Sequence, residues 1–192
     1  MLQTYAALTP APADAVLAAV GAGRLGGYLY RGDTGSSLLF DPPKPRFGRI
    51  SAGRRRNAPW DLAVDAKTPV WLLEEHEGGL CVTAIRPDGN FDQIGWAADW
   101  TPPADPAEAA EHRAGWDAYC TKIAGKMQLG EPTALAASRN DPRPDGTRPS
   151  TKSLMRRLCA LVGAPDAVVG QSLFTHAGPR GNDFVRCDAR GR

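Results

Sequence analysis

Three short apolar runs between Pro69 and Trp96 constrain the fold of this chain more than any other feature. They cover residues 70–73, 80–85 and 91–96, and turn-forming residues separate them. Runs rich in Val, Ile and Trp with turn residues at both ends are typical of β-strands. Because the gaps are too short for crossover connections, neighbouring strands must be antiparallel. The sequence therefore predicts a three-stranded meander, with Gly79 and Gly89 in its two turns.

Helices and further strands are expected on both sides of the meander. Residues 12–23 show a short amphipathic helical pattern, and residues 28–31 and 38–40 predict a hairpin. Asp105 is a good N-cap, with Pro106 at the first helical position and Glu108 three residues after the cap, so a helix is expected up to residue 127. Ser150 or Thr151 caps a last helix over residues 151–162. Two strands at 172–175 and 183–187 complete the prediction.

The predicted fold class is α+β. We expect an antiparallel, curled or barrel-like sheet of about five or six strands, an amphipathic helix packed on it and a C-terminal helix-plus-hairpin unit. Residues 1–130 are assigned to an α+β main domain with the central meander, and residues 131–150 to a Pro-rich surface loop. Residues 151–192 are assigned to a basic helix and β-hairpin unit docked on the main domain.

Charge is unevenly distributed along the chain, although its net value is only +2. Residues 61–113 contain eleven acidic and three basic residues, whereas the segment between Pro42 and Pro59 contains six cations and no acid. Clustered cations can neutralise several phosphates, which gives affinity without sequence choice. The first hypothesis is therefore a small, non-enzymatic, cytoplasmic accessory protein that binds nucleic acid or another polyanion. Its candidate contacts are Lys44, Arg46, Arg49, Arg54, Arg55, Arg56, Lys152, Arg156, Arg157, Arg180 and Arg186.

The C-terminal third offers a second pointer to nucleic acid. Residues 154–173 resemble a helix-turn-helix, with Gly163 in the turn, and the expected hairpin would place Arg180 and Arg186 beside a phosphate backbone. The alternative is that the basic segments pair with the acidic middle of the same chain, and that this unit only completes the core.

An enzyme is the second hypothesis. The tripeptide Tyr30-Arg31-Gly32 is similar to the first motif of ADP-ribosyltransferases and related NAD-consuming toxins, and Glu75-His76-Glu77 is similar to their terminal Glu-x-Glu. The resemblance implies an enzyme acting on NAD or another nucleotide, with Arg31 as phosphate clamp and Glu75 or Glu77 as catalytic carboxylate. The family's middle Ser-Thr-Ser strand is missing. This hypothesis requires Arg31 and one of the glutamates to lie in one pocket.

A protein-binding module of the inhibitor or immunity type is the third hypothesis. Its partner would bind the acidic or Trp-rich middle segment. Tryptophans are most simply part of the core, but they are also favoured at protein interfaces. The five are Trp60, Trp71, Trp96, Trp100 and Trp116.

Metal and membrane sites are not expected. The four cysteines lack C-x-x-C spacing, which predicts no zinc site and suits a reducing compartment. No cofactor motif is present, and no apolar run reaches the roughly 20 residues that span a bilayer. A cytoplasmic protein without a membrane segment is the expectation.

Overall fold

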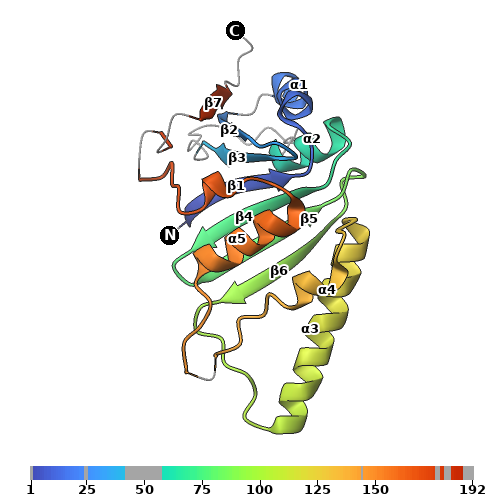
Figure 1. The fold of residues 1–192 in the computed structure, drawn as a ribbon, viewed down its shortest axis with the longest axis vertical. Coiled ribbons are helices and arrows are strands. Elements are labelled where there is room, and N and C mark those ends of the chain that lie inside the picture. Colours follow the sequence, from blue (N-terminus) through green and yellow to red (C-terminus); the bar gives the residue numbers. More distant parts are fainter. Residues whose placement is uncertain are drawn as a thin grey trace, which may run out of the picture.

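One seven-stranded antiparallel sheet forms the centre of the protein (Figure 1). The structure is a computed structural model that describes residues 2–23, 26–41, 58–143, 145–175, 178–179 and 183–187. The strand order is β6-β5-β4-β1-β3-β2-β7, and the sheet is open rather than closed into a barrel. The strands are β1 (Leu2–Thr9), β2 (Gly27–Arg31), β3 (Ser36–Phe40), β4 (Val70–His76), β5 (Gly79–Ile85), β6 (Phe91–Ala97) and β7 (Phe184–Cys187).

The predicted α+β class and the meander are confirmed. Strands β4, β5 and β6 pair in sequence order, and Gly79 (φ 142°) and Gly89 (φ 81°) adopt the positive φ expected in their turns. β4 extends further than predicted, because Glu75 and His76 belong to the strand and not to the turn. The hairpin expected around residues 28–40 is also present, as β2 and β3.

The central strand β1 was not predicted. It pairs with β3 on one side and with β4 on the other, so it joins the N-terminal hairpin to the meander. Its sequence, LQTYAALT, mixes the strand-favouring residues Thr4, Tyr5 and Thr9 with two alanines, so its local signal is less clear than that of the meander. The strand is held by its position between two neighbours, since Ala6, Ala7 and Leu8 are completely buried.

Five α-helices and one 3-10 helix surround the described part of the sheet. They are α1 (Ala13–Gly23), α2 (Ala58–Asp65), α3 (Pro106–Lys126), α4 (Pro132–Ala136), α5 (Thr151–Val162) and η1 (Asp166–Val168). The predicted caps are in place: the Asp105 carboxylate accepts from the amides of Ala107 and Glu108, and Ser150 caps α5. Helix α2 was missed because Pro59 was interpreted as a breaker, although proline is tolerated in the first helical turn.

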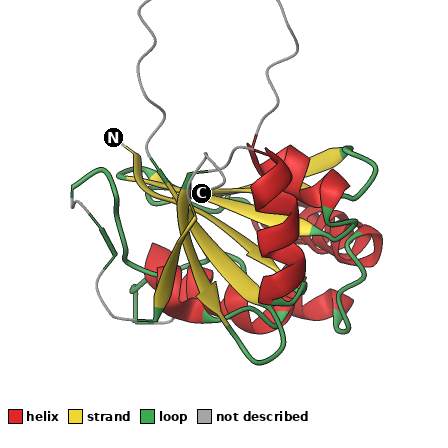
Figure 2. Cartoon of the chain, turned by 90° about the horizontal axis from the view of Figure 1, so that it is seen from above, coloured by secondary structure: helices red, strands yellow, loops and turns green. Residues whose placement is uncertain are grey.

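The helices cover the two faces of the sheet unequally (Figure 2). On one face, α3, α4 and α5 contribute to a core with Trp71, Leu73 and Trp96. On the other, α1 and α2 pack on Leu38, Leu72 and other residues of the N-terminal strands. Alternation of side chains along each strand produces this division.

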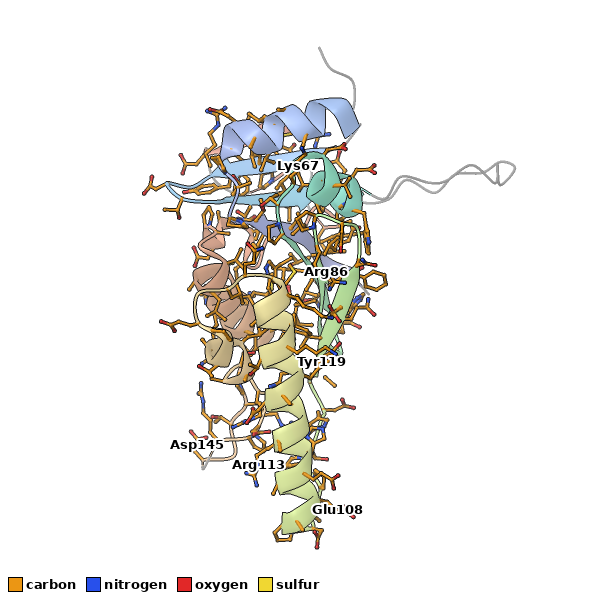
Figure 3. The ribbon with its side chains drawn as sticks, turned by 90° about the vertical axis from the view of Figure 1, so that its right-hand side faces the viewer. Lys67, Arg86, Glu108, Arg113, Tyr119 and Asp145 are labelled. Atoms are coloured by element: carbon orange, nitrogen blue, oxygen red, sulfur yellow. The ribbon has the colours of Figure 1, made fainter. Side chains whose placement is uncertain are left out.

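Only the C-terminal half of α3 packs in the core. Its buried residues are Cys120, Ile123 and Ala124, whereas Tyr119, which was expected in the buried stripe, is 41% exposed. Figure 3 shows α3 extending past the sheet, with Glu108 near its far end. This extension separates part of α3 from β6 and leaves room for the cavity described below.

The C-terminal hairpin was predicted wrongly. Residues 172–175 contain a turn and no strand, and β7 pairs with β2, near the N-terminus, instead of with these residues. The apolar pattern of residues 172–175 reflects partial burial and not a strand. α5, from the same C-terminal segment, shares a core with β4 and α3, while the division of the chain into domains stays a prediction.

None of the helices in the described ranges is both long enough and apolar enough to cross a membrane.

Candidate functional site

A cavity of about 300 Å³ lies where β6, α3 and the segment after α4 meet. It contains three of the five tryptophans together with a short run of polar residues. Trp100 comes from the segment between β6 and α3. The part of α3 that extends past the sheet forms one wall of the cavity. The lining residues are Gly95, Trp96, Ala97, Trp100, His112, Trp116, Arg139, Asn140 and Asp141.

The aromatic side chains form two contacting pairs. Trp96 and Trp116 meet edge to face, with ring centroids 5.7 Å apart, and Trp100 stacks on His112 at 5.0 Å. The indole N–H of Trp96 donates to the Ser138 carbonyl at 2.7 Å, and that of Trp116 donates to a carbonyl of α4 at 2.9 Å. Because both donors are already used, these two indoles offer a ligand ring surface and not hydrogen bonds.

The Asn140 side chain has one amide atom bonded and the other without a partner in the described part of the chain. Its Nδ2 donates to the Ala97 carbonyl at 2.6 Å, which fixes the amide orientation. Its Oδ1 is buried and accepts no hydrogen bond from any described residue, and the residue is only 9% exposed. A buried acceptor left unsatisfied costs about 1–3 kcal/mol, so a bound donor that reaches it would recover this free energy.

Arg139 forms ion pairs with two carboxylates beside the cavity. The Arg139 guanidinium donates to Asp117 at 2.7 Å and to Asp141 at 3.0 Å, so one cation is shared by two carboxylates. These three side chains together carry a formal charge of −1, and they are about one-third to one-half exposed, which weakens each pair. A further cation, Arg148, donates to the Trp100 carbonyl.

Comparison with known proteins gives no lead. The chain matches no protein-family model, no curated protein and no solved structure. Among the described residues, no group of three or more His, Cys, Asp or Glu side chains could hold a metal ion. The interpretation of the cavity therefore depends on its own chemistry.

The basic residues predicted to bind nucleic acid are only partly described. Lys44, Arg46, Arg49, Arg54, Arg55, Arg56 and Arg180 lie outside the described residues. Lys152, Arg156 and Arg157 are exposed on α5.

Each arginine of this set that the structure describes has a local partner. The Nε atom of Arg156 lies 3.5 Å from a carboxylate oxygen of Asp166, and the Arg157 guanidinium donates to the Ala137 carbonyl. Arg186 forms a two-point contact with Asp41 and lies over the Tyr28 ring, on the β2–β7 side of the sheet.

The residues of the enzyme hypothesis are kept apart. Strand register places Arg31 opposite Ser36, at the end of the sheet where β1 finishes, and Glu75 opposite Thr4, near the end where β1 begins. Arg31 and Glu77 line two different cavities. Arg31 and the glutamates therefore cannot act on one substrate in this arrangement.

Glu75 has a structural environment. It is 4% exposed, and its carboxylate accepts from Thr4 at 2.7 Å and from Thr151 at 2.6 Å. These bonds tie the start of α5 to β1 and β4.

Sequence reasoning missed the polar residues of the cavity. Arg139, Asn140 and Asp141 belong to the segment predicted as a Pro-rich surface loop, and nothing in their order, Arg-Asn-Asp, indicates a site. The only signal was the abundance of tryptophans in the middle segment, which include Trp96, Trp100 and Trp116 and for which a protein partner was one of the hypotheses.

Proposed function

We propose that the protein is a non-catalytic protein-binding module and that its tryptophan-lined cavity takes an arginine side chain of the partner. The Oδ1 of Asn140 is the observation that carries this proposal, because it has no hydrogen-bond partner among the described residues and calls for a donor. A guanidinium group has five N–H donors and no acceptor, and it stacks on aromatic rings. Trp96, Trp100 and Trp116 provide such rings around the same space.

Charge supports a cation over a neutral ligand. The cluster of Arg139, Asp117 and Asp141 has a formal charge of −1. A lysine carries the same charge but is a compact, strongly hydrated ammonium that cannot stack as a plane. A nucleobase can stack, but it gains nothing from the negative field. Of these groups, the planar cation fits both features.

The test is a calorimetric titration of the protein with three small probes: N-acetyl-arginine methylamide, its lysine counterpart and AMP. We expect the arginine probe to bind most tightly. A cation–π contact is worth about 0.5–2 kcal/mol, so Trp100→Ala should weaken binding about 2- to 30-fold. Trp60→Ala is the matched control, because Trp60 packs on Phe91 outside the cavity. Equal binding of the lysine probe, or tighter binding of AMP, would overturn the proposal.

Binding of nucleic acid or another polyanion is the second candidate. The observation that favours it is the row of exposed cations Lys152, Arg156 and Arg157 along α5. The contact between Arg156 and Asp166 is highly exposed, and such pairs contribute only about 0–1 kcal/mol, so a phosphate could displace the carboxylate. Lys44, Arg46 and Arg49, which lie outside the described residues, stay candidate contacts on the strength of their charge alone. A cytoplasmic location stays part of the prediction.

This second candidate is tested on a heparin column. Retention should fall steeply with salt and should decrease in the double variant Lys152→Ala/Arg156→Ala, as well as when Arg54, Arg55 and Arg56 are all replaced by alanine. Lys122→Ala, an exposed cation on α3, is the matched control for loss of charge. Elution of the unmodified protein without retention at low salt would reject polyanion binding.

A further inference from the structure

Strand β6 is an edge strand whose outward-facing backbone groups can be identified. At the two ends of the β5–β6 pair, the backbone N–H of Arg86 donates to the Asn90 carbonyl and that of Ala98 donates to the Gly78 carbonyl, both at 2.8 Å. Hydrogen-bonded positions alternate along an antiparallel pair. The register then makes residues 92, 94 and 96 the bonded positions of β6. Residues 93, 95 and 97 therefore direct their N–H and C=O groups away from β5.

Side chains already occupy the edge on both sides of Gly95. The Gln93 carbonyl accepts from the Tyr119 hydroxyl at 2.9 Å, and the Ala97 carbonyl accepts from Asn140 Nδ2 at 2.6 Å. Within the described ranges, no hydrogen bond satisfies the outward N–H or C=O of Gly95. Gly95 also lines the tryptophan cavity, so this gap in the edge opens at the binding site.

We infer that the partner binds as an extended segment that adds to β6, with one of its residues paired to Gly95 and the adjacent arginine in the cavity. This inference rests on the proposed function. A residue opposite Gly95 in an antiparallel pair would exchange two hydrogen bonds with it. Its own side chain would share the face of Gly95, where a Cβ atom placed on Gly95 meets nothing within 4 Å.

The neighbouring partner residues would point to the opposite face. That is the face of Trp96, because successive side chains alternate along a strand. An arginine next to the paired residue therefore enters the cavity from the strand edge.

The experiment compares the blocked arginine probe with the dipeptide acetyl-Arg-Thr-methylamide, whose threonine pairs with Gly95. We expect the dipeptide to bind at least about tenfold more tightly, since it adds backbone hydrogen bonds to the side-chain contact. N-methylation of the threonine should remove this gain, because it deletes the donor that pairs with Gly95. N-methylation of the arginine is the matched control and should be tolerated, because its N–H points away from β6.

Amide hydrogen exchange measured by NMR gives a direct readout of the backbone contact. Exchange at Gly95 should slow at least tenfold with the saturating dipeptide and stay unchanged with the blocked arginine. Gly130, which is exposed and outside the cavity, serves as the internal control. Binding of the arginine probe without any gain from the dipeptide would overturn strand addition alone. Failure of both ligands to bind would overturn the proposed function as well.

Discussion

Replacement of Leu158 by alanine tests whether the C-terminal helix belongs to the main core. Leu158 is completely buried on α5, in the same cluster as Trp71 and Leu73 of β4 and Ile123 of α3. Its side chain therefore connects a segment near the C-terminus to the centre of the sheet. Loss of this side chain would leave a cavity between α5 and the strands.

The expected cost follows from the burial of the leucine. A buried Leu→Ala substitution destabilises by about 2–5 kcal/mol, because the transfer free energy of the lost methyl groups adds to the cost of the cavity. With a urea m-value of about 3 kcal/mol/M, the unfolding midpoint should fall by roughly 1 M. Ala160→Ser, at an exposed position of the same helix, should change the free energy of unfolding by only about 0.5 kcal/mol.

Urea denaturation followed by tryptophan fluorescence and by circular dichroism measures this effect. Trp71 and Trp96 belong to the cluster and report on its loss. One cooperative transition, shifted to lower urea and coincident for both probes, is the predicted result. An unchanged midpoint, or a separate early transition seen by circular dichroism without a fluorescence change, would refute the shared core.

Three further predictions concern single positions. Gly79→Ala should destabilise the protein by at least about 1–3 kcal/mol in thermal unfolding, because Gly79 has φ 142° and an added Cβ would collide with the Trp96 carbonyl. Gly78→Ala, with open space around it, should be nearly neutral. Equal effects of the two substitutions would contradict the role of Gly79. Burial alone would raise the pKa of Asp92, but the hydrogen bonds from Lys126 and Arg86 outweigh it and hold the pKa below its usual range. The ionised Asp92 carboxylate therefore stabilises the fold above about pH 4, and this contribution is lost as the pH falls through the folded pKa. The difference in free energy of unfolding between the unmodified protein and Asp92→Asn should narrow from about pH 4 to 2, and a constant difference would count against this account. Burial, with a smaller effect of the nearby Asp166, raises the pKa of Cys159 to about 12. Its thiol should therefore resist Ellman's reagent at pH 7 until the protein unfolds, whereas half-buried Cys81 should react first. Rapid labelling of Cys159 would disprove its burial.

Local sequence signals were sufficient for the elements whose ends are marked by capping or turn residues. Asp105 with Pro106 defined the start of α3, and Gly79 and Gly89 defined the turns of the meander. Strand β1 was not found in this way, because two alanines interrupt its strand-favouring residues and its place in the sheet depends on pairing with the distant strands β3 and β4. α2 was lost because Pro59 fits both a breaker and a helix start, and the single sequence does not distinguish them.

The candidate site was less predictable than the fold. Trp96 and Trp116 lie 20 positions apart, and the Asn140 amide reaches the Ala97 carbonyl across 43 positions. Such contacts depend on how α3 and the segment after α4 return to the edge of β6, which no local pattern determines. Arg31 and Glu75 illustrate the opposite error, because two motif-like tripeptides were joined in one hypothesis although strand register keeps them at opposite ends of the sheet.

The most direct test of the account follows the five indole N–H signals by NMR while N-acetyl-arginine methylamide is added. Trp96, Trp100 and Trp116 line the cavity, whereas Trp60 and Trp71 do not and act as internal references. We predict saturable shifts of the three cavity signals and constant positions for the other two. Shifts confined to Trp60 and Trp71, or no saturable change in any indole, would contradict arginine recognition by the cavity.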